Sequence, residues 1–239
     1  MRNTLLIFMF LFSSLFPSRL KAETNPCFEY CVEGTRCLCS LENNVLIIES
    51  GSYQAESFLT SSYDKIIIKG DNILFGDSSF FKIRGDVEIL GNSIQFGLGA
   101  FEKMQRTVTI SGSDILFGKN AFMESQGTIK ILGNNLIFGD YAFEKSQGKI
   151  DVSGLDISFG GNAFQETQGM IQIPGTNIKF GPLAFISSQG TVLLSGNNLI
   201  FNDYAFEKSQ STVKVISKTI KLGDSAFYKA SGNVIYEDT

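Results

Sequence analysis

The most reactive side chains in this sequence belong to four cysteines that lie close together, Cys27, Cys31, Cys37 and Cys39. Cysteine thiols form disulfides, hold zinc or act as nucleophiles, and each use requires different surroundings. The C-x3-C-x5-C-x-C spacing matches no common zinc-binding pattern, and the chain contains no histidine to act as the base for a thiol nucleophile. An even number of closely spaced cysteines predicts two disulfides in an exported chain, with all three pairings open.

An export signal precedes these cysteines. Arg2 is followed by an apolar run from Leu5 to Phe16, and the small residue Ala22 provides a cleavage position. The run is too short to cross a hydrocarbon core, which takes about 20 residues. We therefore predict a signal peptide over residues 1–22 and a secreted or extracellular protein, free or attached to a cell surface. No apolar tail ends the sequence, so we expect no membrane span.

Composition argues against several classes of chemistry. The net charge is −4 and the charges are scattered, whereas nucleic-acid binding requires clustered Lys and Arg. Histidine is absent, and Asp151 and Asp156 stand apart from the paired carboxylates that a polysaccharide-cleaving enzyme needs. We therefore predict that the chain is not an enzyme, has no catalytic, cofactor or metal site, and does not bind nucleic acid.

Phenylalanines recur every 21 residues over most of the chain. A second column, which starts at Phe80 and ends at Phe227, follows a small residue in each unit. A unit of this length cannot bury its own apolar face, whereas a stack of similar units can. The pattern predicts a solenoid whose columns become ladders of stacked rings. The first ladder consists of Phe75, Phe96, Phe117, Phe138, Phe159, Phe180 and Phe201.

Each unit contains two short stretches in which apolar and polar residues alternate, for example TIKI (128–131) and NLIF (135–138). Alternation with β-branched residues predicts two short strands per unit. Glycines such as Gly133 and Gly139 mark the corners, where we expect positive φ angles. The DYAFEKSQ segment lacks alternation and predicts one helical or 3₁₀ turn. The predicted fold class is a mainly β, single solenoid of stacked 21-residue coils.

Short polar side chains form a third column at one corner. Side chains of this length bond to the backbone of their own or the next coil, so we expect a structural ladder rather than a ligand site. The column consists of Asn72, Ser93, Asp114, Asn135, Asp156, Asn177, Asn198 and Thr219. Glutamines from Gln105 to Gln210 form another column, for which we expect stacked amides.

The ends of a solenoid must be covered. Residues 23–57 are therefore predicted to form a disulfide-stapled N-terminal cap, and residues 58–239 a solenoid of about eight coils. Val234 and Tyr236 still occupy core columns near the end of the sequence. We therefore expect self-association or a partner at the C-terminal coil.

The segments FGDYAF, FGDSSF and LGDSAF resemble the BspA-type (bacterial surface protein A) leucine-rich repeats. The family unit is similar to I-x-I-P-x-x-V-x-x-I-G-x-x-A-F-x-x-C-x-x-L, and its pattern is matched by Val152, Phe159, Gly160, Ala163, Phe164 and Pro174. The resemblance extends from about Phe58 to Tyr236, although Ser or Lys replaces the family cysteine. It implies a leucine-rich-repeat-like solenoid and a secreted or cell-surface interaction protein, often associated with adhesion.

The leading hypothesis is therefore binding or adhesion, with a protein or glycan as the partner. Its contact residues are expected on the outward columns of the two strands. On the first strand these are Thr107, Thr109, Thr128 and Lys130; on the second, Leu116 and Ile137 should be neighbours on adjacent coils and form a small apolar patch.

Two alternatives belong to other classes. A structural protein could assemble into a coat or wall through its C-terminal coil, and concentration-dependent polymers would distinguish it from a binding module. An ice-binding solenoid would need two outward threonine rows, and Thr107 and Thr109 are the one place where both rows hold threonine.

Overall fold

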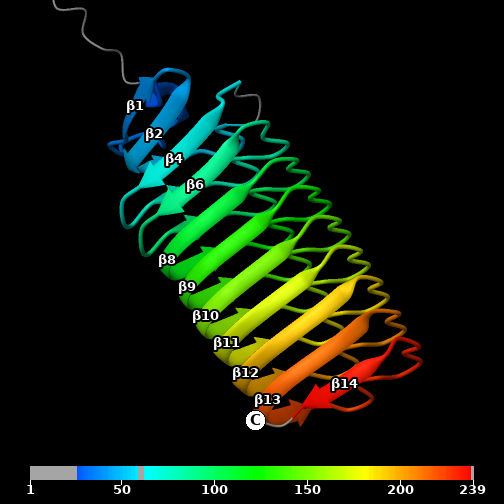
Figure 1. Cartoon of the computed structure of the whole chain (residues 1–239). Coiled ribbons are helices and arrows are strands. Elements are labelled where there is room, and N and C mark those ends of the chain that lie inside the picture. The colour runs from blue at the N-terminus through cyan, green and yellow to red at the C-terminus, as the bar shows by residue number, and fades with distance from the viewer. Residues whose placement is uncertain (1–25, 59–61, 238–239) are drawn as a thin grey trace, which may run out of the picture.

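The structure is a computed structural model that describes residues 26–58 and 62–237. The predicted signal peptide lies outside the described residues. The chain forms a mainly β solenoid with coils of about 21 residues, as predicted, and has about nine turns where about eight were expected. Figure 1 shows the coils stacked into a regular elongated body, with the N-terminal cap at one end.

The strands fall into three groups. The cap holds a short 3₁₀ helix, η1 (Phe28–Tyr30), and β1 (Leu38–Glu42). The next three coils have separate first and second strands: β2 (Val45–Ser50) with β3 (Ser52–Tyr53), β4 (Lys65–Lys69) with β5 (Leu74–Phe75), and β6 (Asp86–Leu90) with β7 (Gln95–Phe96). The later coils contain β8 (Val108–Phe117), β9 (Ile129–Phe138), β10 (Ile150–Phe159), β11 (Ile171–Phe180), β12 (Thr191–Phe201), β13 (Thr212–Leu222) and β14 (Val234–Glu237).

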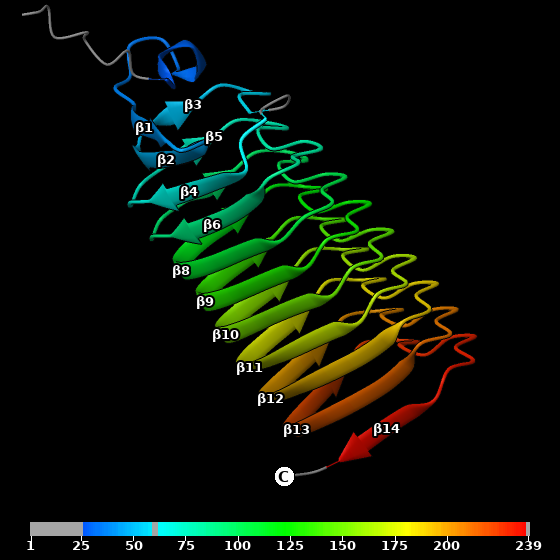
Figure 2. The ribbon, with the colours of Figure 1, turned by 45° about the horizontal axis from the view of Figure 1, so that its top comes forward.

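The two predicted stretches of each coil are joined in the later coils. From β8 to β13, one bent strand of ten or eleven residues replaces the two short strands. The strands pair in parallel with a register of one repeat, so that Leu116 lies beside Ile137 and Gly112 beside Gly133. The backbone hydrogen bonds between neighbouring coils therefore continue through the glycine corner. Figure 2 shows the two strand layers that result on either side of the bend.

Glycine occupies this corner for a reason other than the one expected. Among described residues, most positive φ angles belong to other residue types, including Asn135, Tyr141 and Lys145. At Gly133, an added Cβ would lie 1.7 Å from the carbonyl oxygen of Gly112 in the preceding coil. Gly133 is required at this corner because the two consecutive backbones approach too closely for a side chain there. In the coils from β4 to β13, only β13 has another residue, Ser217, at the equivalent position.

The segment after the second strand, predicted as one helical or 3₁₀ turn, forms consecutive turns closed by bonds between residues three apart. In the β9 coil, the N–H of Glu144 donates to the carbonyl of Tyr141 at 3.1 Å, and that of Ser146 donates to the carbonyl of Phe143 at 3.2 Å. The N–H of Phe143 instead donates to Ala163 of the next coil at 2.7 Å. The third side of the coil is therefore also tied to its neighbour by backbone bonds.

The predicted phenylalanine ladders form the core. Successive rings in each ladder are nearly parallel, for example Phe138 and Phe159, whose centroids are 4.9 Å apart. The two ladders also contact each other: the centroids of Phe138 and Phe143 lie 5.3 Å apart with the rings tilted by 49°. Both ladders therefore lie in one continuous apolar interior.

A buried row of hydroxyl groups was not predicted. It consists of Ser125, Ser146, Thr167, Ser188 and Ser209. Their hydroxyls are bonded, as when Ser146 donates to the carbonyl of Phe122 at 2.9 Å and Thr167 to that of Phe143 at 3.0 Å. A small hydroxyl residue before glutamine in five successive units was the available signal.

Two disulfides secure the cap, as predicted. Cys27 pairs with Cys39 and Cys31 pairs with Cys37. β1 runs antiparallel to β2, whereas β2 already pairs in parallel with β4. Parallel stacking thus begins at Val45, and Tyr53 stacks on Phe75 as the first ring of the ladder, with centroids 5.2 Å apart. Within the described residues, no helix is long and apolar enough to cross a membrane.

Candidate binding face

The residues predicted to contact a partner lie on two different outer faces. Thr109 and Lys130 are neighbours on the first-strand face, which precedes the glycine corner. Leu116 and Ile137 are neighbours on the second-strand face, which follows it. Leu116 is 40% exposed and Ile137 is 43% exposed, so the predicted apolar patch exists as an exposed pair.

Thr107 and Thr128 are also exposed on the first-strand face, but these two threonines, Thr109 and Lys130 do not line the groove described below. The predicted contact residues therefore do not form one site. Ile137 alone among them lines the hollow described next.

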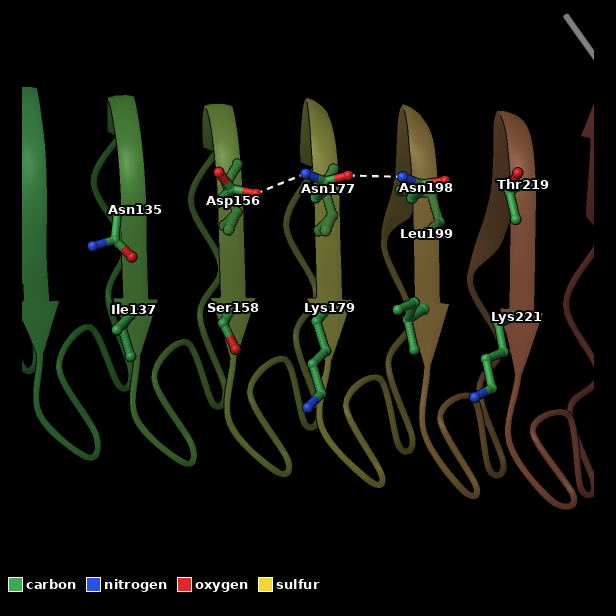
Figure 3. A pocket seen from close by; sticks show the side chains of 13 residues that line it. Asn135, Ile137, Asp156, Ser158, Asn177, Lys179, Asn198, Leu199, Thr219 and Lys221 are labelled. Carbon is green, nitrogen blue, oxygen red and sulfur yellow. Dashed lines mark hydrogen bonds between the residues drawn. The ribbon is translucent and has the colours of Figure 1, made fainter.

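A shallow groove of about 510 Å³ runs along the second-strand face from β9 to β13. Its volume lies in the range typical of small-molecule sites. Two rows of side chains border it, and Figure 3 shows them from close by. One row is Asn135, Asp156, Asn177, Asn198 and Thr219; the other is Ile137, Ser158, Lys179, Ile200 and Lys221. Ile157, Ile178 and Leu199, which are buried, lie between the rows.

The first row is the predicted corner ladder, and it is hydrogen bonded. The Asn177 Nδ2 donates to Asp156 Oδ1 at 2.7 Å, and the Asn198 Nδ2 donates to Asn177 Oδ1 at 2.8 Å (Figure 3). Asn135 bonds in the same way to Asp114 of the preceding coil, at 2.6 Å. These bonds hold the amides in a fixed row, while every member remains exposed to a ligand.

The second row combines aliphatic, hydroxyl and cationic side chains. Lys179 and Lys221 occupy alternate coils and form no ion pair with any described residue. Asp156 is the one carboxylate among the described residues that line the groove. The groove therefore offers hydrogen-bonding groups, aliphatic surface and two positive charges.

The glutamine column differs from its prediction. Gln105, Gln126, Gln147, Gln168, Gln189 and Gln210 are exposed, and their side-chain amides form no hydrogen bond with described residues. The expected stacked amide ladder is therefore not formed at this corner.

The side chains whose pKa is shifted lie away from the groove. Burial raises the pKa of Tyr236 to about 12 and raises the pKa of Tyr53 in the cap. A hydrogen bond with Glu102 raises the pKa of Lys103 on the turn side. Among the described residues, no group of three or more His, Cys, Asp or Glu is placed to hold a metal ion. What the groove offers is recognition by hydrogen bonds and apolar contact.

Most of the groove residues were not selected from the sequence as contacts. Asp156, Asn177 and Asn198 belong to the column for which the sequence predicts a structural ladder, and Ser158, Lys179 and Lys221 are not among the predicted contact residues. The signal in the sequence that could have indicated the groove is the recurrence, on the second strand of successive repeats, of an amide position followed two residues later by an aliphatic one. No family model matches the chain, and no similar curated protein or solved structure was found.

Proposed function

We propose that this chain is a secreted or cell-surface, non-enzymatic repeat protein that binds a protein or glycan partner through the second-strand face. The groove between the amide row and the Ile137 row carries this proposal. Its rows run along the solenoid axis, so a partner gains contacts coil by coil, as in other stacked-repeat binding surfaces.

Three further observations support the proposal. The two disulfides indicate an oxidising environment, in agreement with an exported protein. The sequence contains no histidine, and Asp156 has no second carboxylate beside it in the groove lining. The likeness of the repeats to the BspA-type pattern supports surface interaction and adhesion, and we propose a relationship to that family.

The first test asks where the chain is located. Intact cells of the source organism are labelled with antibody before and after external protease treatment, and the medium is fractionated by size. Protease-sensitive surface label, or a discrete protein in the medium that rebinds to cells or their matrix, is the expected result. Label that appears only after permeabilisation contradicts an exported binding protein, and concentration-dependent polymers favour a coat.

A pair of variants then tests the face. Ser158→Arg places a long cationic side chain in the middle of the groove. Gln95→Arg introduces the same side chain at an equivalent position of the second strand, outside the groove. We expect Ser158→Arg to weaken surface binding at least about tenfold, which corresponds to 1.4 kcal/mol. Gln95→Arg should bind like the natural chain. Equal effects of the two variants would assign binding to another face.

A further inference from the structure

Two coils of the groove carry nearly the same residues along the second strand and the turn that follows it. The segments GNNLIFGDYAFEKSQ (133–147) and GNNLIFNDYAFEKSQ (196–210) differ at one position, Gly139 against Asn202. They cover the second-strand halves of β9 and β12 and the turns that follow. Shared packing accounts for the identical buried residues. It does not account for the identical exposed ones, such as Asn134 and Asn197.

The identity stops at the first-strand face of the same two coils. There Lys130 corresponds to Leu193, and Leu132 to Ser195, although these side chains also point outward. The identity therefore singles out the second-strand side and its turn as the surface that the two coils share.

Two tyrosines within these segments give a second indication. Tyr141 and Tyr204 have φ angles of 58° and 56°, in the left-handed region. This conformation costs a residue with a side chain about 1–2 kcal/mol. The same position has a positive φ in every coil from Ser78 to Ser225, with Asn120, Asn162 and Leu183 among its occupants, so this backbone conformation belongs to the fold. The choice of tyrosine at both places is a further feature that the two segments share.

The two segments place equal hydrogen-bond acceptors in the groove. Asn135 and Asn198 each donate Nδ2 to the preceding coil, and neither Oδ1 accepts a hydrogen bond from a described residue. An isoleucine stands two residues further along each strand and lines the groove: Ile137, which is exposed, and Ile200, which is half-buried. Figure 3 shows Ile137. The two acceptors are three coils apart, roughly 14 Å at the usual spacing between strands.

We propose that the groove binds a linear chain of β-linked hexoses that lies parallel to the solenoid axis. This inference rests on the proposed binding function of the same groove. Adjacent coils are separated by about one sugar: the stacked ring centroids stand 4.9 Å apart from Phe138 to Phe159 and 5.2 Å from Phe159 to Phe180. An extended β-linked hexose chain advances by nearly the same length per sugar, so one sugar lies over each coil. Because successive sugars are turned over, equivalent hydroxyl groups return at every second coil.

The chemistry of the two rows suits such a chain. Sugar hydroxyls both donate and accept, and the ladder offers amide donors together with the free acceptors on Asn135 and Asn198. The C–H faces of the sugars pack against Ile137 and Ile200. An extended peptide fits the spacing less well, because its same-side groups repeat at roughly 6.6 Å, which is not a multiple of the coil spacing, whereas the same-side groups of the sugar chain return after two coils. The side chains of a bound peptide would therefore fall out of step with the coils after the first one.

Calorimetry with the full chain tests this inference. The ligands are cello- and chito-oligosaccharides from disaccharide to hexasaccharide, a uronate-containing oligosaccharide, and an α-linked maltohexaose for comparison. We expect affinity to rise with length to the tetrasaccharide, which reaches both Asn135 and Asn198, and to level off at the pentasaccharide, which covers all five groove coils. Maltohexaose should bind at least about tenfold more weakly than the best β-linked hexasaccharide.

Two variants locate the site. Ile137→Thr and Ile200→Thr remove apolar contact but keep a β-branched residue that suits the strand. Each should weaken tetrasaccharide binding about fivefold, and both together more strongly. Leu74→Thr is the matched control, because Leu74 is 44% exposed in the same column but lies outside the groove. Circular dichroism confirms that each variant retains its strands.

The remaining outcomes separate this inference from the proposed function. If no linear glycan binds at millimolar concentration, yet Ser158→Arg abolishes binding to cells, the groove takes a protein and the glycan inference is wrong. Binding without length dependence, or equally sensitive to Leu74→Thr, also overturns it. If neither oligosaccharides nor cell surfaces bind, both proposals are wrong.

Discussion

At the scale of single residues, the corner of each coil is where two backbones come closest. The Cβ of alanine at Gly133 would overlap the carbonyl oxygen of Gly112, and both atoms within 3.0 Å are backbone atoms of Gly112, so no movement of a side chain relieves the overlap. This carbonyl belongs to a parallel ladder that continues through the corner. Relief of the overlap therefore requires that two coils separate.

We predict that Gly133→Ala lowers the stability of the protein by more than about 3 kcal/mol. Gly161→Ala is the control, because the nearest atom to its added Cβ is 3.4 Å away, which is an ordinary contact. Gly161→Ala should change the stability of the protein by less than about 1 kcal/mol. Urea unfolding followed by circular dichroism measures both. Similar midpoints for the two variants would show that close approach does not determine the use of glycine.

Tyr53 is the one phenol in the first ring ladder. Its hydroxyl donates to the carbonyl of Ser50 at 2.8 Å, and burial raises its pKa above the ordinary value of 10.0. Because the folded-state pKa is the higher one, this stabilisation is present below pH 10 and is lost as pH rises through the folded-state pKa.

We therefore predict that Tyr53→Phe costs about 1 kcal/mol at pH 7, where it removes one hydrogen bond. Above pH 10 the difference in stability between Tyr53→Phe and the natural chain should shrink. Tyr53 then loses its proton and its stabilising effect, whereas phenylalanine cannot ionise. Tyr236, whose pKa is raised to about 12, still titrates in both proteins. Thermal midpoints recorded from neutral to strongly alkaline pH check the prediction. Two parallel curves would contradict it.

At the scale of elements, periodicity alone predicts the strands and the core columns. Alternation in TIKI and NLIF places Ile129, Ile131, Leu136 and Phe138 inside, and all four are buried. The bend that joins the two stretches into one strand was not predictable, because the glycine corner has no alternation of its own. Of the two predicted forms of the turn segment, the α-helical one was wrong, because the backbone bonds of this segment to the next coil are not encoded locally.

The ring ladders make each coil depend on its neighbours. Phe159 is buried and stacks on Phe138 and Phe180, with centroids 4.9 Å and 5.2 Å away. We predict that Phe159→Ala costs about 3–5 kcal/mol, since it leaves a cavity in a continuous stack. Phe28→Ala serves as the control, because Phe28 is 78% exposed and should change stability by less than about 0.5 kcal/mol. Chemical unfolding distinguishes these values, and equal losses would rule out the ladder as the main source of stability.

At the scale of the whole molecule, function depends on what successive coils present together. No single repeat contains the groove, since its rows are assembled from the coils of β9 to β13. The sequence predicts which positions face outward. It does not predict that the Asn135 row and the Ile137 row border a hollow, because this depends on the bend between the strand layers and on side-chain length in five coils.

The same one-dimensional architecture determines how the molecule opens. Each interior coil is bonded on both sides, whereas β14 pairs with β13 alone among the described strands. At the other end, β1 and the two disulfides cover β2, and Cys27 is fully buried against the core. We predict the slowest amide exchange in β9–β11, and faster exchange in β14 than in β2.

Reduction of the disulfides should remove this asymmetry. Without its cross-links the cap loses a stabilisation of about 2–4 kcal/mol, so β2 and β4 should then exchange nearly as fast as β14, while β9–β11 remain protected. Hydrogen exchange read by mass spectrometry, with and without reductant, follows each coil separately. Uniform exchange along the chain before reduction, or an unchanged pattern afterwards, would mean that the solenoid opens as a single unit and that the cap does not protect its end.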